Sequence, residues 1–245
     1  MFELPAILII LAVFCVAMLY SSVGHGGASG YLAVMALLAV TPDVTRPTAL
    51  LLNVFVASIA FLQFYRAGHF DWKIFLPFAV GSVPMAFIGG SIHLPTFYYK
   101  IILGVCLILA AIRLALNLKS DAAETRAPQV WICFLIGGIL GFVSGLVGVG
   151  GGVFLTPILL LMNWTETKKA AGVSALFILV NSISGLAGNY AQVLKLPVTV
   201  YVWIVAAVIG GVIGATLGSY RFNSLVLRRV LAVGLVISGA KLIFT

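Results

Sequence analysis

Two long stretches without a charged side chain set the strongest limit on how this chain can fold. Residues 4–42 and 127–165 each run for 39 residues without Asp, Glu, Lys or Arg. An α-helix rises about 1.5 Å per residue, so a straight helix of that length would reach nearly twice the ~30 Å hydrocarbon core of a bilayer. Each stretch is therefore expected to break and turn inside a membrane.

The rest of the chain also has the pattern of a membrane protein. Hydrophobic residues make up 62% of the sequence and charged residues only 8%, far from the values of soluble domains. Six further apolar runs have the length of about 20 residues that crosses a bilayer. They are 47–66, 73–93, 97–117, 170–190, 198–219 and 226–244. The sequence thus predicts an all-α polytopic membrane protein.

The net charge of +8 does not indicate nucleic acid as a partner. The basic residues lie in the segments between apolar runs and form no basic face, which is typical of loops beside the lipid bilayer and its anionic headgroups. Cys15, Cys106 and Cys133 lie inside apolar runs without paired spacing, so we expect them to pack rather than to bind a metal. No cofactor is predicted.

Glycine runs mark the break in each long stretch and reveal an internal repeat. Gly24, Gly26 and Gly27 match Gly148, Gly150 and Gly151 at an offset of 124 residues, and Asn53 matches Asn181 at 128. Gly81 and Gly89 match Gly210 and Gly218 at 129, within ordinary spans, where close helix packing explains them. The sequence predicts a first membrane repeat over 1–117, a polar cytoplasmic linker over 118–128 and a second membrane repeat over 129–245.

The distribution of Lys and Arg predicts how the two repeats are oriented. If each broken stretch crosses the membrane once, seven basic residues fall on each face, which gives no bias. If each enters and returns as a hairpin, ten fall on one face and four on the other, namely Arg46, Lys100, Lys195 and Lys241. Because cytoplasmic loops collect Lys and Arg, the second arrangement is favoured. The predicted fold is two inverted repeats, each a Gly-broken helical hairpin followed by three transmembrane helices, with both termini on the non-cytoplasmic face.

The breaks also predict a binding site. Helices that restart near residues 28–41 and 152–162 would begin with free N–H groups and a partial positive charge, which favour an anion near the bilayer midplane. Glycine lets the backbone approach such a ligand closely. The predicted substrate-binding residues are Ser21, Ser22, Gly24, His25, Gly26, Gly27, Asn53, Ser144, Gly148, Gly150, Gly151, Gly152 and Asn181.

Three features of this site also have an interpretation other than ligand binding. The glycine runs could instead serve helix packing alone. His25 is the one ionisable side chain in the two charge-free stretches, and it could donate to an anion, carry a coupling proton or fill space as a neutral side chain. Asn53 and Asn181 could contact the ligand or bridge neighbouring helices. Arg46, near a predicted helix end, is expected to extend towards the membrane surface.

The motifs S-S-V-G-H-G-G from Ser21 and S-G-L-V-G-V-G-G-G from Ser144, each opening one half of the chain, resemble the TauE/SafE sulfite exporter family. This family is also called the toluene sulfonate uptake permease family. The resemblance covers nearly the whole chain. It implies secondary transport of sulfur-containing or organic anions, such as sulfite, sulfoacetate or sulfonates, across a bacterial plasma membrane.

Two other functions compete with this interpretation. A passive anion channel would share the helix-end anion site. An intramembrane hydrolase is suggested by Gly27-Ala28-Ser29-Gly30 near His25. The base of such a protease comes from a separate helix, however, and His69 and His93 lie at loop edges, so we expect no enzyme. No P-loop is present, so active transport would need a coupling proton, another ion or a partner ATPase. Substrate identity, direction of transport and homodimer formation stay open.

Overall fold

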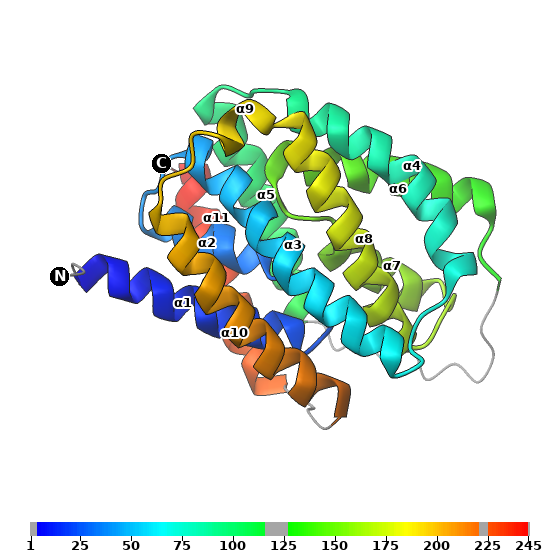
Figure 1. Cartoon of the computed structure of the whole chain (residues 1–245). Helices are drawn as coiled ribbons and strands as arrows, with labels where there is room; N and C mark the ends of the chain where they lie inside the picture. Colours follow the sequence, from blue (N-terminus) through cyan, green and yellow to red (C-terminus); the bar gives the residue numbers. More distant parts are fainter. Residues whose placement is uncertain (1–3, 116–126, 221–224, 245) are drawn as a thin grey trace.

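The computed structural model describes residues 4–115, 127–220 and 225–244, and every regular element in these ranges is an α-helix (Figure 1). This confirms the predicted all-α class. The helices are α1 (Leu4–Ser21), α2 (Ala28–Leu37), α3 (Pro42–Arg66), α4 (Trp72–Ser91), α5 (Thr96–Ala115), α6 (Val130–Val147), α7 (Gly152–Leu161), α8 (Thr167–Gly188), α9 (Tyr190–Val193), α10 (Thr199–Tyr220) and α11 (Leu225–Phe244).

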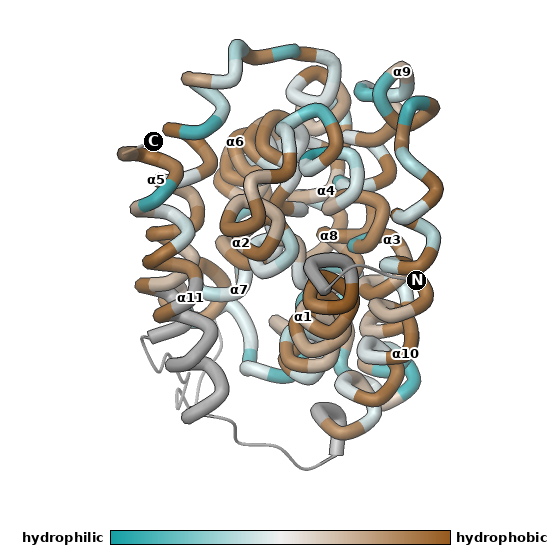
Figure 2. Tube along the Cα trace, turned by 90° about the vertical axis from the view of Figure 1, so that its left-hand side faces the viewer, coloured by the Kyte–Doolittle hydropathy of each residue, from teal (hydrophilic) through white to brown (hydrophobic). Residues whose placement is uncertain are grey.

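Within the described residues, five helices are long and apolar enough to cross a membrane. These spans are Pro42–Arg66, Trp72–Ser91, Val130–Val147, Thr167–Gly188 and Thr199–Leu217. The six predicted single spans coincide with α3, α4, α5, α8, α10 and α11 to within a few residues. Figure 2 shows the hydrophobic residues along the helices, with the hydrophilic ones mostly near helix ends and in the turns. The chain is a multi-pass membrane protein.

Both charge-free stretches break at the predicted glycines. Helix α1 ends at Ser21 and α2 begins at Ala28, while α6 ends at Val147 and α7 begins at Gly152. The breaks contain glycines with positive φ, a conformation that side chains with a Cβ rarely adopt. They are Gly24 (φ 76), Gly27 (φ 94), Gly148 (φ 89), Gly150 (φ 81) and Gly151 (φ 75).

The chain reverses at each break. Near the start of α2, a Cβ on Gly30 would meet the side chains of Val16 and Tyr20 on α1. At the second break, a Cβ on Gly151 would lie 3.5 Å from the Ser144 Cβ of α6. Helices α2 and α7 have ten residues each, so each is only about 15 Å long, which is about half the thickness of a hydrocarbon core.

Local sequence signals fix the ends of the neighbouring helices. Helix α3 begins with Pro42 at its first position, where the missing N–H costs no hydrogen bond. It ends before Gly68, whose φ of 77 allows the His69 N–H to reach the Phe64 carbonyl. The Asp71 side chain then accepts a hydrogen bond of 2.8 Å from the Lys73 N–H and starts α4.

Two central helices separate two outer pairs. Helices α3 and α8 run antiparallel, with Asn53 against Ser182 and Phe64 against Gly172. On one side α4 packs parallel to α6, and on the other α1 packs parallel to α10 (Figure 1). Helices α5 and α11 pack on each other through Gly104 and Gly239.

Glycines form the close contacts in both outer pairs. A Cβ on Gly81 or Gly89 of α4 would overlap backbone atoms of α6, and a Cβ on Gly210 of α10 would overlap the Phe14 carbonyl of α1. The packing role predicted for these three glycines is confirmed. The side-chain surroundings of Gly218 lie outside the described part of the chain.

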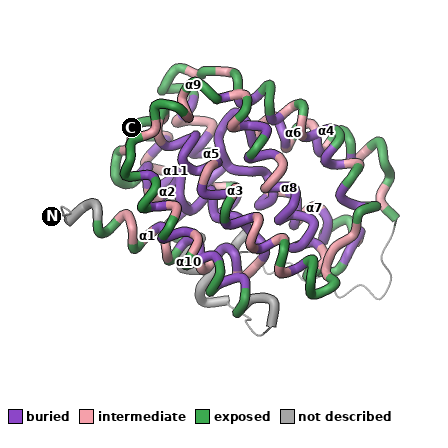
Figure 3. Tube along the Cα trace, viewed as in Figure 1, coloured by how far each residue is buried: buried purple, intermediate pink, exposed green. Residues whose placement is uncertain are grey.

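Burial is greatest around the breaks. Helix α2, although it is one of the shortest, is almost fully buried, and α8 is buried along most of its length (Figure 3). The predicted linker falls mainly on residues 116–126, which lie outside the described residues, so the repeat boundaries remain a prediction.

Candidate functional site

The two glycine breaks meet around two side chains of the central helices. A Cβ on either Gly26 or Gly150 would overlap the Asn53 amide, and each would lie 3.0 Å from Ile178 Cγ2. Gly26 and Gly150 are the residues that the repeat places in register. Asn53 from α3 and Ile178 from α8 therefore lie between the first break and the second.

Asn53 caps the helix that starts at the first break. The Ala28 N–H donates to Asn53 Oδ1 at 3.0 Å, and Asn53 Nδ2 donates to Ser182 Oγ at 3.4 Å. A carboxamide oxygen at this position satisfies one of the N–H groups that a helix start leaves free. The Ala28 N–H, one of the donors that the sequence predicted to be open to a ligand, thus already binds a side chain of the protein.

Other backbone donors at the breaks have no acceptor among the described residues. In the first break these are the N–H groups of Gly26, Gly27 and Ser29. In the second break they are those of Val149, Gly150 and Gly151. All of these residues are buried. Buried N–H groups without acceptors, at the positive ends of two helix dipoles, make the space between the breaks attractive to an anion.

His25 links the first break to the second half of the chain. The residue is only 2% exposed; Nδ1 lies 2.9 Å from the Val23 carbonyl and Nε2 lies 3.2 Å from Thr156 Oγ1 of α7. Thr156 Oγ1 in turn lies 2.7 Å from Ser174 Oγ of α8. A buried chain of groups that can exchange a proton therefore joins the first break, α7 and α8.

The repeat-related residue Asn181 is bonded differently from Asn53. Its Nδ2 donates to the Phe177 carbonyl of its own helix at 2.7 Å, and its Oδ1 is buried with no hydrogen-bond partner. Ser144 Oγ, at the end of α6, is also buried without a partner. The start of α7 therefore has no equivalent of the Asn53 cap, and two polar groups near the second break have unused hydrogen-bonding capacity.

The remaining predicted residues form the walls of the breaks. Gly24 lies against Ala171 of α8, Gly148 against the Arg46 backbone and Gly152 against Ile178. The Ser21 and Ser22 hydroxyls donate to the carbonyls of Met18 and Leu19 in their own helix. The structure thus brings the glycines together with Asn53 and His25, whereas the two serine hydroxyls bond within α1.

Arg46 is buried, contrary to the expectation that it would extend towards the membrane surface. It is 5% exposed, and its guanidinium donates to four backbone carbonyls: Gly145 at 2.9 Å, Ile92 at 2.8 Å, Gly89 at 2.7 Å and Gly90 at 2.6 Å. These carbonyls lie at the C-terminal ends of α4 and α6, where helix dipoles are negative and favour a cation. No carboxylate among the described residues pairs with Arg46.

The candidate hydrolase motif does not form a serine–histidine pair. The Ser29 hydroxyl donates to the Tyr20 hydroxyl of α1 at 3.0 Å. A nucleophilic serine needs a hydrogen bond to its base, so this geometry does not support the hydrolase alternative.

The comparisons with known proteins agree with this architecture. A sequence profile described as Sulfite exporter TauE/SafE matches residues 9–242. The chain is 39% identical to "Probable membrane transporter protein y4hK" of Sinorhizobium fredii, over 99% of this chain and 100% of that protein. It is 25% identical to "Probable membrane transporter protein YunE" of Bacillus subtilis, over 84% and 82% of the two chains. No solved structure matches the chain. The protein therefore belongs to the sulfite exporter TauE/SafE family, a family of membrane transporters.

Proposed function

We propose that this protein is a secondary transporter that moves a small organic or sulfur-containing anion, of the sulfite, sulfoacetate or sulfonate type, across the bacterial plasma membrane. The substrate would be held near the bilayer midplane between the starts of α2 and α7. The observation that carries the proposal is the convergence of both glycine breaks on Asn53, which puts two helix starts around the same buried side chain.

An anion suits this space for electrostatic reasons. Unbonded N–H groups from both breaks face a region of low dielectric constant, where a hydrogen bond to a charged acceptor is stronger than in water. The two 39-residue stretches contain no Asp or Glu that would repel the ligand. A cation would instead meet the positive ends of two helices.

The packing favours a carrier over an open pore. Asn53 and Ile178 fill the space between the breaks, so a substrate can bind only if these side chains or the helices that carry them move. We propose that the two halves are inverted copies and that one rocks against the other. The antiparallel pairing of α3 with α8 is the arrangement that such copies require, and it supports this part of the proposal.

A proton is the coupling ion that the site supports best. His25 is the ionisable side chain at the break, and the Thr156 and Ser174 hydroxyls extend from it into the second half. A proton taken up by His25 would also add a positive charge beside the proposed anion.

Two measurements test the proposal. Purified protein is first screened for thermal stabilisation by sulfite, sulfate, sulfonates and carboxylates at two pH values, since a ligand that binds the folded state raises its stability. The stabilising anion is then supplied to sealed proteoliposomes with an inward proton gradient. Accumulation above the external concentration, abolished by a protonophore, is expected. Equilibration without accumulation would instead identify a passive channel.

A further inference from the structure

A basic cavity lies at the far end of α2, away from the glycine breaks. Its volume is about 390 Å³, within the range of small-molecule sites. It is lined by α2, the segment that joins α2 to α3, the start of α3, and the ends of α5 and α11 near that segment. Two lysines line it, Lys100 from α5 and Lys241 from α11. No Asp or Glu lines this cavity.

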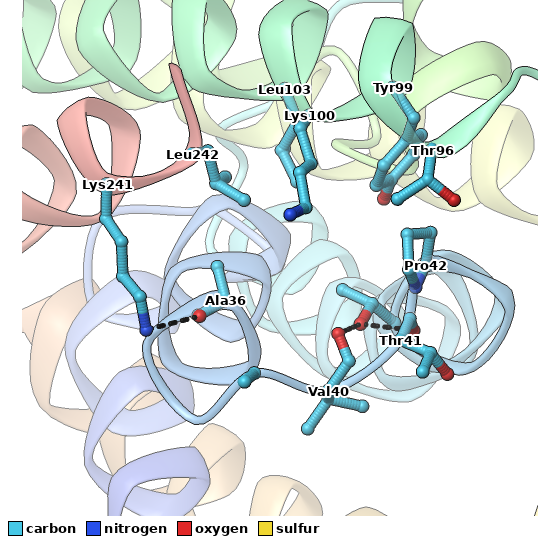
Figure 4. A pocket seen from close by; sticks show the side chains of 12 residues that line it. Ala36, Val40, Thr41, Pro42, Thr96, Tyr99, Lys100, Leu103, Lys241 and Leu242 are labelled. Atoms are coloured by element: carbon cyan, nitrogen blue, oxygen red, sulfur yellow. Dashed lines mark hydrogen bonds between the residues drawn. The ribbon is translucent and has the colours of Figure 1, made fainter. Parts of the chain in front are cut away.

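The two ammonium groups differ in how they are bonded. Lys241 Nζ donates to the carbonyls of Ala36 and Leu37, at 3.4 Å and 3.0 Å, and so binds the C-terminal end of α2. Lys100 is half-buried and makes no hydrogen bond or ion pair with the described residues. Figure 4 shows Lys100 reaching from α5 into the cavity, without a dashed bond, while Lys241 reaches the Ala36 carbonyl.

The other walls complete an environment for an amphipathic anion. Pro42 and Thr96, which begin α3 and α5, line the cavity, so the positive ends of two helices lie in its wall. Leu103, on the same helix as Lys100, and Leu242, next to Lys241, supply apolar surface (Figure 4). Asp43, which follows Pro42 in the sequence, does not line this cavity; it lines an adjoining cavity of about 40 Å³ that shares Pro42 and Tyr99 with it.

We propose that this cavity is a vestibule that binds an anionic group attached to a short hydrocarbon portion, with Lys100 as its principal contact. The inference rests on the proposed transport function, because the cavity and the first glycine break lie at opposite ends of the same short helix. Helix α2 is about 15 Å long, so the vestibule would receive the anion before or after it occupies the breaks. The distribution of Lys and Arg predicts that this end lies on the non-cytoplasmic face.

The repeat extends this argument to the other end of α5 and α11. At the offset of 128 residues that relates Asn53 to Asn181, Lys100 corresponds to Arg228 and Arg113 to Lys241. Since α5 and α11 are antiparallel, each end of the pair has one basic position from each helix. A basic position from each helix at both ends agrees with a transporter that opens alternately to two sides.

The test is binding of para-fluorobenzoate to the purified full-length protein in a neutral detergent, measured by fluorine NMR. Lys100→Gln is expected to weaken binding ~10-fold or more, the effect of losing a charge-assisted hydrogen bond, whereas Lys100→Arg should retain most of the affinity. Lys195→Gln is the matched control, because Lys195 is an exposed lysine of the same predicted face and does not line the cavity. Uncharged para-fluorobenzamide should bind much more weakly than the acid.

Lipid headgroups share this chemistry and are distinguished by a second arm. The measurement is repeated in nanodiscs of phosphatidylcholine with and without phosphatidylglycerol. Equal affinity in both identifies a water-soluble anion as the occupant. If phosphatidylglycerol weakens para-fluorobenzoate binding to the wild-type protein but not to Lys100→Gln, the occupant of the cavity is an anionic lipid.

Two results would overturn the vestibule. One is equal affinity of Lys100→Gln and Lys195→Gln at unchanged melting temperature, and the other is equal affinity for the acid and the amide. Uptake into sealed vesicles separates this failure from that of the proposed function. If Lys100→Gln weakens binding but the wild-type protein shows no uptake, the transport function is refuted and the vestibule is not. If the wild-type protein shows uptake but Lys100→Gln does not change the affinity, the vestibule is refuted and the transport function is not.

Discussion

At the scale of single residues, Asn53 and Asn181 show how one repeated amide can have two roles. The Asn53 oxygen caps α2, whereas the Asn181 oxygen has no partner, although the repeat places the two amides in equivalent positions. The polar side chains at the first break therefore have their hydrogen-bonding capacity more completely used than those at the second. If the two halves exchange roles during transport, the cap would be expected to exchange with them.

This asymmetry predicts different effects of two equivalent substitutions. Asn53→Ala should lower the stability of the purified protein by about 1 kcal/mol, the cost of losing a helix cap. Asn181→Ala should cost less, because it removes one bond to a carbonyl of its own helix and relieves an unsatisfied buried oxygen. Thermal unfolding in detergent compares the two variants directly. A larger loss of stability in Asn181→Ala would contradict this account of the breaks.

His25 is predicted to set the pH dependence of transport. Histidine changes charge near neutral pH, and the Thr156 hydroxyl beside His25 can accept or donate its proton. His25→Gln should make the uptake rate less dependent on pH between about pH 5 and about pH 8. Thr156→Val serves as a companion variant that removes the neighbouring hydroxyl but keeps the ring. A wild-type pH profile in His25→Gln would leave His25 with a packing role only.

At the scale of helices, Arg46 joins three elements that are far apart in the sequence. From α3 it binds the C-terminal carbonyls of both α4 and α6, so one side chain fixes where these two helices end. All three guanidinium nitrogens, Nε, Nη1 and Nη2, donate to these carbonyls, so Arg46 is not free to bind substrate in this state.

Arg46→Met should therefore destabilise the protein by at least about 2 kcal/mol, because it leaves several buried carbonyls without a donor. Arg46→Lys should recover part of this loss, since a single ammonium cannot reproduce the planar guanidinium geometry. Arg66→Met is the control, because Arg66 lies exposed at the other end of the same helix. If Arg46→Met melted at the same temperature as Arg66→Met, the carbonyl contacts would contribute nothing measurable.

The parallel contact between α4 and α6 depends on glycine at particular positions. A Cβ on Gly141 would overlap the Ser82 backbone, while a Cβ on Gly138, one turn earlier, would meet its neighbours at an ordinary 3.7 Å. Gly141→Ala should cost about 1–3 kcal/mol through overpacking. Gly138→Ala should be neutral or stabilising by about 0.5–1 kcal/mol, because alanine favours a helix. Melting temperatures that do not differ would show that α6 shifts to accommodate the added methyl group.

The sequence predicted features that depend on local pattern and missed those that depend on distant contacts. Helix positions followed from apolar lengths, and both breaks followed from charge-free stretches too long for one span. The partners of His25 could not be predicted, since Thr156 lies 131 residues away and a lone threonine in an apolar helix has no distinctive pattern. Arg46 was misplaced because its position near a helix end indicates exposure, whereas carbonyls from two other helices make burial favourable.

At the scale of the whole molecule, the account depends on the meeting of two breaks from opposite halves of the chain. The outer pairs α4–α6 and α1–α10 are close-packed through glycine, while polar groups collect between the central helices. Rigid outer pairs around a polar centre are suited to movement of one half against the other. The basic cavity beside α2 would then give the anion a path to the breaks from one side.

The most direct test is the affinity of the purified protein for its stabilising anion after a negative charge is placed between the breaks. Asn53→Asp keeps an oxygen that can cap α2, so the fold should persist, while the carboxylate repels an anion bound nearby. Gln63→Glu adds the same charge further along α3, beside Thr216. The account predicts that Asn53→Asp weakens anion binding ~10-fold or more, that Gly26→Ala does the same by filling the break, and that Gln63→Glu has little effect. Unchanged affinity in both folded break variants would contradict it.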